Sequence, residues 1–97
     1  MVYKYRDTIT VAAGSGSGNT VSVHGICRRF YIEPTTATTI YKVNVTDDDS
    51  DTIKNYEWKQ GTYQDFTPFI MQGINTINIT NSTANENFVI KLYIEEL

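Results

Sequence analysis

Apolar and polar residues alternate with a period of two along most of the chain. The alternation is cleanest near the C-terminal end, where Phe88, Ile90, Leu92 and Ile94 occupy every second position. This period is expected of a β-strand that buries one face. β-Branched residues dominate and leucine is scarce, a bias that suits the half-buried surface of a sheet. We expect strands over seven stretches: 3–11, 20–33, 39–45, 52–59, 68–72, 75–80 and 87–95.

These strands predict an all-β fold, because no window of the sequence has helical periodicity. Polar turns separate the strands, so we expect an antiparallel β-sandwich of about seven strands, immunoglobulin-like or jelly-roll-like, with a small barrel as the alternative. A chain of 97 residues has room for one domain, which would span 1–97. The residues expected in its core are Phe30, Ile32, Val43, Ile77, Ile79, Phe88, Ile90, Leu92 and Ile94.

Two features interrupt the strand pattern in the first third of the chain. The apolar parity changes from odd at Val23 to even at Ile26, on either side of His24 and Gly25. A change of one position at a glycine predicts a β-bulge and a bend, which would let one long strand serve both sheets. Residues 12–19 are rich in glycine and serine and predict a flexible loop.

Charge and targeting signals restrict the classes of partner. The formal net charge is −3 and the eight lysines and arginines are spread thinly, whereas phosphate binding needs a concentrated basic surface. Arg28 and Arg29 form the only basic pair, and neighbours on a strand point to opposite faces. Residues 1–10 contain no basic segment followed by an apolar run, which predicts neither a signal peptide nor a membrane span. We therefore expect synthesis in a cytoplasm, with no nucleic-acid partner and no membrane partner.

Residue types needed for catalysis are scarce. Cys27 and His24 are the only cysteine and histidine, and a spacing of three places them on opposite faces of a strand. We expect Cys27 to be a small buried residue and His24 to lie at the surface or in a turn. No serine lies in a glycine elbow, and adjacent carboxylates occur only where we expect them to be hydrated. The sequence therefore predicts a protein that is not an enzyme, with no catalytic residues and no cofactor.

The acidic run 47–51 places four carboxylates in five residues. Calcium binds oxygen ligands of this kind, but the run lacks the glycine and the terminal glutamate of the twelve-residue calcium loop. We interpret it as a solvated acidic turn without a metal, and calcium binding is the alternative.

Aromatic residues are the strongest candidates for a binding surface. The chain has seven tyrosines, four phenylalanines and one tryptophan, and aromatic rings anchor both cores and interfaces. Alternation in 52–59 predicts that Tyr56 and Trp58 share a face, where they would form a sugar-stacking platform with Tyr63. We favour the alternative, a place for these rings in the core or at a hydrophobic rim. The candidate partner-binding residues are Tyr3, Tyr5, Tyr56, Trp58, Tyr63 and Phe66.

Two segments, 27–41 (CRRFYIEPTTATTIY) and 73–86 (GINTINITNSTANE), resemble small β-sandwich structural proteins of tailed bacteriophages. The resemblance is one of style, in a short chain with threonine- and asparagine-rich strands. It implies a non-enzymatic virion structural protein, closest to a capsid decoration or cement protein that binds the outer shell in many copies. The implied location is the virion, and the implied partner is the major capsid protein or another virion protein. Head-tail and tail components share the same sequence features.

A decoration protein must also reach its partner. The strand near the N-terminus, 1–11, could pair with the edge of a partner's sheet, and the loop 12–19 would give it reach. We expect the free protein to associate with itself weakly at most, with a homo-oligomer as a further possibility. The alternative from another class is a carbohydrate-binding or adhesin-type β-sandwich module, which would use Trp58, Tyr56 and Tyr63.

Overall fold

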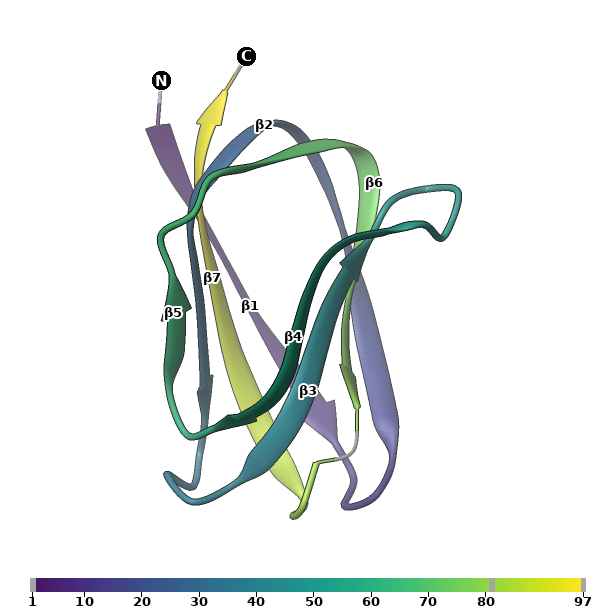
Figure 1. Cartoon of the computed structure of the whole chain (residues 1–97), viewed down its shortest axis with the longest axis vertical. Coiled ribbons are helices and arrows are strands. Elements are labelled where there is room, and N and C mark those ends of the chain that lie inside the picture. The colour runs from purple at the N-terminus through teal and green to yellow at the C-terminus, as the bar shows by residue number, and fades with distance from the viewer. Residues whose placement is uncertain (1, 81, 97) are drawn as a thin grey trace.

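The computed structural model describes residues 2–80 and 82–96, and its elements are seven antiparallel strands (Figure 1). Met1, part of the expected N-terminal arm, lies outside the described residues. The fold is all-β, as predicted. The strands are β1 (Val2–Val11), β2 (Gly16–Pro34), β3 (Ile40–Thr46), β4 (Thr52–Gln60), β5 (Tyr63–Asp65), β6 (Phe69–Thr80) and β7 (Glu86–Glu96).

The strands form one continuous sheet that folds back on itself into two layers. The order along the sheet is β1-β7-β2-β6-β3-β4, and β5 pairs with β2. One layer holds β1, β7, the second half of β2 and β5, while the other holds the first half of β2, β6, β3 and β4. Along the sequence, the paired strands β3 and β4 lie between the paired strands β2 and β6, which in turn lie between the paired strands β1 and β7. This nested pairing is the jelly-roll-like form of the predicted sandwich.

β2 joins the two layers because it bends in the middle. It pairs with β6 from Gly16 to Cys27 and with β7 from Gly25 to Pro34, and in Figure 1 β2 and β6 arch together over the top of the molecule. The predicted bend is therefore confirmed. The bulge lies at Arg28, however, because the register with β7 shifts between Cys27 and Arg29. The predicted position at His24 and Gly25 was wrong by a few residues.

Gly25 has a different role in the bend. A β-carbon at this position would lie only 2.4 Å from the carbonyl oxygen of Glu95 and 2.8 Å from the Ile94 side chain. Glycine therefore permits β7 to approach the bend of β2 closely.

The core lies between the two layers and contains all nine residues predicted for it, each at most 2% exposed. Rings from opposite layers meet there: Phe30 of β2 packs on Tyr56 of β4, and Tyr41 of β3 packs edge-on against Phe88 of β7, each with centroids 5.1 Å apart. Side chains of this size contribute about 1.5–3 kcal/mol each when fully buried. Cys27 is also fully buried, and His24 is exposed, as predicted.

The observed strands differ from the predicted ones in three places. The loop predicted over 12–19 ends at Ser15, because Gly16 begins β2 and its backbone pairs with Thr80 of β6. The strands predicted over 68–72 and 75–80 are one strand, β6, in which Gly73 takes a positive φ of 71° without ending the ladder. β5 was not predicted, because three residues are too few to show an alternation.

β1 is part of the sandwich. All ten of its residues pair with β7, and Ile9 and Val11 are each 1% exposed. β1 ends the sheet order, so its second edge carries no strand in the described part of the chain. The expected pairing of this edge with a partner stays a prediction.

Candidate functional site

The six residues predicted to bind a partner do not lie on one surface. Tyr3, Tyr5 and Tyr63 are partly buried and pack against the core, and Tyr56 is 5% exposed. Trp58 and Phe66 are 56% and 66% exposed. Only these last two present most of a ring to solvent.

Trp58 leaves the face of Tyr56 because β4 carries an extra residue. Tyr41 pairs with Lys59 and Val43 pairs with Tyr56, so three steps in β4 oppose two in β3. Trp58 takes a φ of 51°, in the left-handed region that a bulky side chain rarely adopts. The prediction that Tyr56 and Trp58 share a face was wrong. Trp58 instead lies outside, with the Lys42 Nζ 4.5 Å from its ring centroid.

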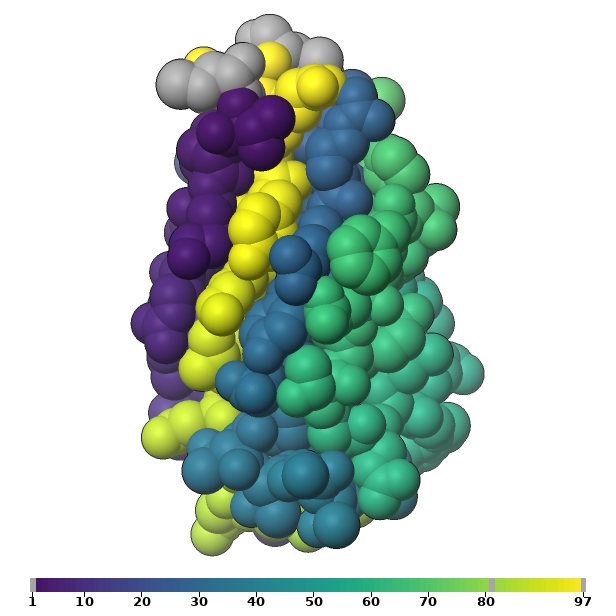
Figure 2. All heavy atoms as spheres, turned by 90° about the vertical axis from the view of Figure 1, so that its left-hand side faces the viewer, coloured from purple at the N-terminus to yellow at the C-terminus, as the bar shows by residue number. Residues whose placement is uncertain are grey.

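A second surface, which the sequence did not predict, covers the outer side of the layer formed by β1, β7, β2 and β5. Figure 2 shows these strands side by side, from purple β1 through yellow β7 and blue β2 to green β5. The inward positions of β2 and β7 are buried and those of β1 are buried or partly buried, so the alternate positions point outward. We call the basic and aromatic residues on this outer side the basic-aromatic face: Lys4, Arg6, Arg28, Arg29, Tyr31, Phe66, Lys91 and Tyr93.

Strand register brings these residues together from distant parts of the sequence. Arg6 of β1 lies opposite Lys91 of β7, and Lys91 lies opposite Tyr31 of β2. The bulge at Arg28 changes the outward parity, so that Arg29 faces outward and Arg28 reaches the outward Glu95, with Arg28 Nη2 2.5 Å from its Oε1. The expectation that Arg28 and Arg29 point to opposite faces was therefore wrong.

Cations and rings are interleaved on this face. The Arg29 guanidinium carbon lies 4.7 Å from the ring centroid of Tyr93 and 5.4 Å from that of Phe66, and the Lys91 Nζ lies 4.7 Å from that of Tyr31. Arg29 also donates from Nε to Gln64 Oε1 at 2.8 Å. Each cation-ring contact at such a site contributes about 0.5–1 kcal/mol and restricts the side chains that form it.

Charge is distributed unevenly between this face and the rest of the molecule. The face carries five of the eight basic residues of the chain, and of the eleven acidic residues only Glu33 and Glu95 point outward with them. The bond from Arg28 and its positive charge lower the pKa of Glu95. A chain with a formal charge of −3 thus presents a positive surface here, and the basic residues are not spread thinly in space.

The single thiol of the chain is unsuited to catalysis. Cys27 is 0% exposed, burial raises the pKa of its thiol to about 11, and the thiol donates to the backbone oxygen of Arg29. A thiol with such a pKa is protonated at neutral pH and is not a nucleophile.

Two carboxyl groups are held ionised by hydrogen bonds. Glu86 is 5% exposed and accepts bonds from Thr39 Oγ1 at 2.5 Å and from the Thr36 N–H at 3.1 Å, which lower its pKa. Burial raises the pKa of Asp65, but bonds from Tyr56 and Thr67 and the nearby Lys54 outweigh it and hold the pKa below its ordinary value. General acids need the opposite shift, so neither group is suited to that role.

Comparison with known proteins adds no family to these observations. The sequence matches no protein-family model and no curated protein. Within the described residues, no helix has the length and apolar character to cross a membrane.

Proposed function

We propose that the chain is a non-enzymatic structural protein that docks through its basic-aromatic face onto an acidic surface of a larger protein assembly. The observation that carries this proposal is the gathering of five cations and three aromatic rings on one outer sheet face of an acidic chain. Arginine and tyrosine are also among the residue types most enriched at the energetic centres of protein interfaces. The assembly that the resemblance implies is a bacteriophage virion, with the major capsid protein or another virion protein as the partner.

The arrangement of the rings favours a protein partner over single-stranded nucleic acid. Bases would bind by stacking on free aromatic faces. Here Lys91 stands over Tyr31, and Arg29 stands over Tyr93. Cations thus cover these ring faces and are held in place by them. The charge of each cation remains available to pair with the carboxylates of a protein partner.

The pairing of Arg6 with Lys91 supports an anionic partner. Like charges directly opposite each other on neighbouring strands destabilise a sheet by up to about 1 kcal/mol. A negative surface placed over the pair would remove this repulsion. The charge pattern is thus complementary to an acidic partner.

The proposal can be tested with two double variants of equal charge change. Arg6→Glu with Lys91→Glu reverses the centre of the basic-aromatic face, whereas Lys42→Glu with Lys59→Glu reverses charge on β3 and β4. Each variant would be coexpressed with the proteins encoded by the genes adjacent to its own, and its occupancy on the purified particles would be measured. We expect the first variant to lose at least about tenfold in affinity and the second to bind like the wild type.

Three results would contradict the proposal. They are equal binding by both double variants, absence of the wild-type chain from the particles, and saturable binding of a fluorescent single-stranded oligonucleotide with a steep salt dependence. Sedimentation of the free protein would show whether a second copy, whose remaining surface is acidic, is the partner instead. We expect weak self-association at most.

A second candidate function rests on Trp58. Its exposure of 56% and its positive φ present a ring outward, as a carbohydrate-binding module would require. The three-ring platform is not assembled, because Tyr56 is buried. Titration of glycans against tryptophan fluorescence tests this function, and saturable quenching by a sugar would favour it over docking.

A further inference from the structure

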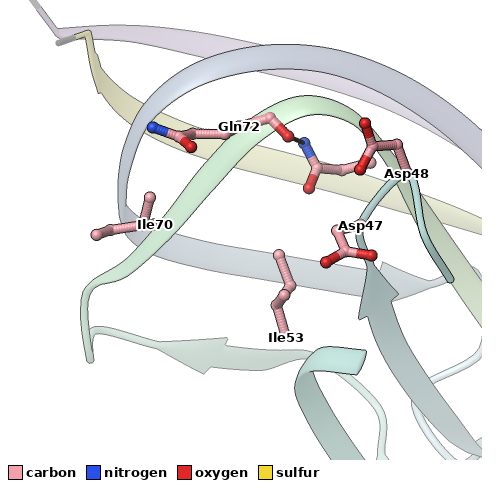
Figure 3. Close-up of a pocket in the computed structure, with 6 residues that line it drawn as sticks. Asp47, Asp48, Ile53, Ile70 and Gln72 are labelled. Atoms are coloured by element: carbon pink, nitrogen blue, oxygen red, sulfur yellow. Dashed lines mark hydrogen bonds between the residues drawn. The ribbon is translucent and has the colours of Figure 1, made fainter. Parts of the chain in front are cut away.

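A cavity of about 230 Å³ lies between the acidic turn 47–51 and the bend of β6 (Figure 3). It is separate from the basic-aromatic face: the turn lies at the right of Figure 1, and the layer with the face at the left. The turn with the start of β4 and the bend of β6 each line it with polar residues and one isoleucine. The lining residues are Asp47, Asp48, Ile53, Ile70, Gln72 and Asn75.

Asn75 supplies a buried oxygen without a partner. Its side chain is 0% exposed, and its Oδ1 accepts no hydrogen bond in the described structure. Its Nδ2 donates to the carbonyl oxygen of Gly73 at 3.1 Å and to that of Gln72 at 3.5 Å, and the bond to Gln72 is dashed in Figure 3. These acceptors fix the orientation of the amide, since only the nitrogen can donate to them, and Oδ1 is the atom left for the cavity that Asn75 lines. A buried acceptor left unpaired costs about 1–3 kcal/mol, so its presence points to a missing ligand.

Carboxylates gather at the same place. One oxygen from each of Asp47, Asp48 and Asp49 lies within 4.8 Å of the other two. Asp48 Oδ2 is also 3.8 Å from the point where a β-carbon would stand on Gly73, the residue whose carbonyl holds Asn75. Among the described residues, the ion pairs are Arg28 with Glu95 and Lys54 with Asp65, so no basic side chain neutralises this group.

The turn itself is held in shape by its own backbone. Asp47 Oδ1 accepts the N–H groups of Asp49 and Asp51, each at 2.9 Å, and the Asp47 N–H donates to the Asp51 carbonyl oxygen. Ser50 takes a φ of 66° to close the turn. The Asp47 carboxylate is thereby oriented at the cavity that it lines before any ligand arrives.

We propose that this cavity binds a calcium ion through the carboxylates of Asp47 and Asp48 and the Oδ1 of Asn75, with water completing the shell. All these ligands are oxygens, which hard cations prefer, and no sulfur or imidazole lines the cavity. Calcium accepts six to eight oxygens in irregular geometry, whereas magnesium requires a near-ideal octahedron and is seldom held by side chains alone. Asp49 contributes charge near the ion.

The test compares two isosteric variants of the same turn in full-length protein freed of metal by a chelator. Asp48→Asn removes a charge that lines the cavity, whereas Asp51→Asn removes a charge from the same turn outside the lining. Calcium chloride would be titrated into each protein by calorimetry, with magnesium chloride as the comparison. We expect wild-type dissociation constants of about 0.1–1 mM for calcium, a loss of at least about tenfold in Asp48→Asn, and little change in Asp51→Asn.

A third variant, Asn75→Leu, tests the buried oxygen. It should abolish the increase in melting temperature that calcium gives the wild type, while the chelated variant still shows the β-sheet circular dichroism of the wild type. Absence of saturable calcium binding would overturn the proposal. So would equal weakening by Asp48→Asn and Asp51→Asn, or magnesium binding as tight as calcium binding. These results leave the docking proposal untouched, because that proposal concerns the opposite side of the molecule.

Discussion

At the scale of residues, the Asp65 carboxylate is held by contacts to Tyr56, Lys54 and Thr67. Its Oδ2 accepts the Tyr56 hydroxyl at 2.6 Å and lies 3.3 Å from Lys54 Nζ, while its Oδ1 accepts the Thr67 N–H at 2.9 Å. Burial, followed by the bond to Asp65, raises the pKa of Tyr56. The phenol therefore stays protonated and keeps donating. The network links β5, which lies in the layer of the second half of β2, to β4 of the other layer.

Protonation of Asp65 should weaken the fold in acid. Its folded pKa is lower than its unfolded one, so the network stabilises the protein above the ordinary pKa of an aspartate, and this contribution is lost as pH falls through the folded pKa. We expect Asp65→Asn to cost about 1–3 kcal/mol at neutral pH, and progressively less as pH falls below the ordinary pKa of an aspartate. Urea unfolding over a descending series of pH values measures this. A loss that does not change with pH would show that the carboxylate charge is not involved.

Cys27 should react only after the chain opens. With no exposed surface and a pKa of about 11, about one thiol in ten thousand is ionised at neutral pH. We expect a thiol-reactive disulfide dye to label the native protein orders of magnitude more slowly than the protein in guanidinium. Labelling of the native protein at the unfolded rate would contradict this placement.

At the scale of elements, the bend of β2 joins the two layers and depends on a close approach to β7. Gly25→Ala should destabilise the fold by about 1–3 kcal/mol, because its β-carbon would meet the backbone oxygen of Glu95. Gly16→Ala is the matched control in the same strand. There the nearest atom, 3.1 Å away, belongs to the Thr80 side chain, and we expect a loss of no more than about 0.5 kcal/mol. Similar losses in the two variants would contradict this role of Gly25.

Sequence pattern predicted those elements whose alternation is long and regular. The uninterrupted alternation from Phe88 to Ile94 identified β7 and its buried face. The pattern predicted the bulge near His24 and Gly25 instead of at Arg28, where it lies. The reason is that Ile26 is apolar but only partly buried, so the apolar pattern changes parity before the buried face does. The bulge that turns Trp58 outward left no signal in composition, since tryptophan rarely takes a positive φ.

The basic-aromatic face could not be predicted from one sequence for a related reason. Lys4 and Arg6 are distant from Lys91 along the chain, and only the register of β1 with β7 makes them neighbours. The residues that line the proposed calcium site are partly neighbours in sequence and partly neighbours only in the fold. Its carboxylates are adjacent in sequence and are candidate ligands from the sequence alone, whereas Asn75 is distant along the chain and lines the same cavity only because the fold places β6 beside the acidic turn.

At the scale of the whole molecule, the N-terminal strand belongs to the fold. Deletion of 1–11 would remove the buried Ile9 and Val11 and expose the full edge of β7. We expect the truncated chain to unfold or aggregate, as measured by circular dichroism and sedimentation. Lys4→Glu with Arg6→Glu, which changes only the outer side of β1, should keep the wild-type spectrum. A folded, monomeric truncated chain would show that β1 is a separable arm.

The docking proposal rests on the uneven distribution of charge between the basic-aromatic face and the rest of the molecule. A reconstruction of the assembled particle tests this proposal most directly. Cryo-electron microscopy of particles formed with the proteins encoded beside this chain would show which surface meets the partner. We expect β1, β7, β2 and β5 to face the partner, with Arg29 and Lys91 against acidic side chains. Contact through β3 and β4 around Trp58, or particles without this chain, would contradict it.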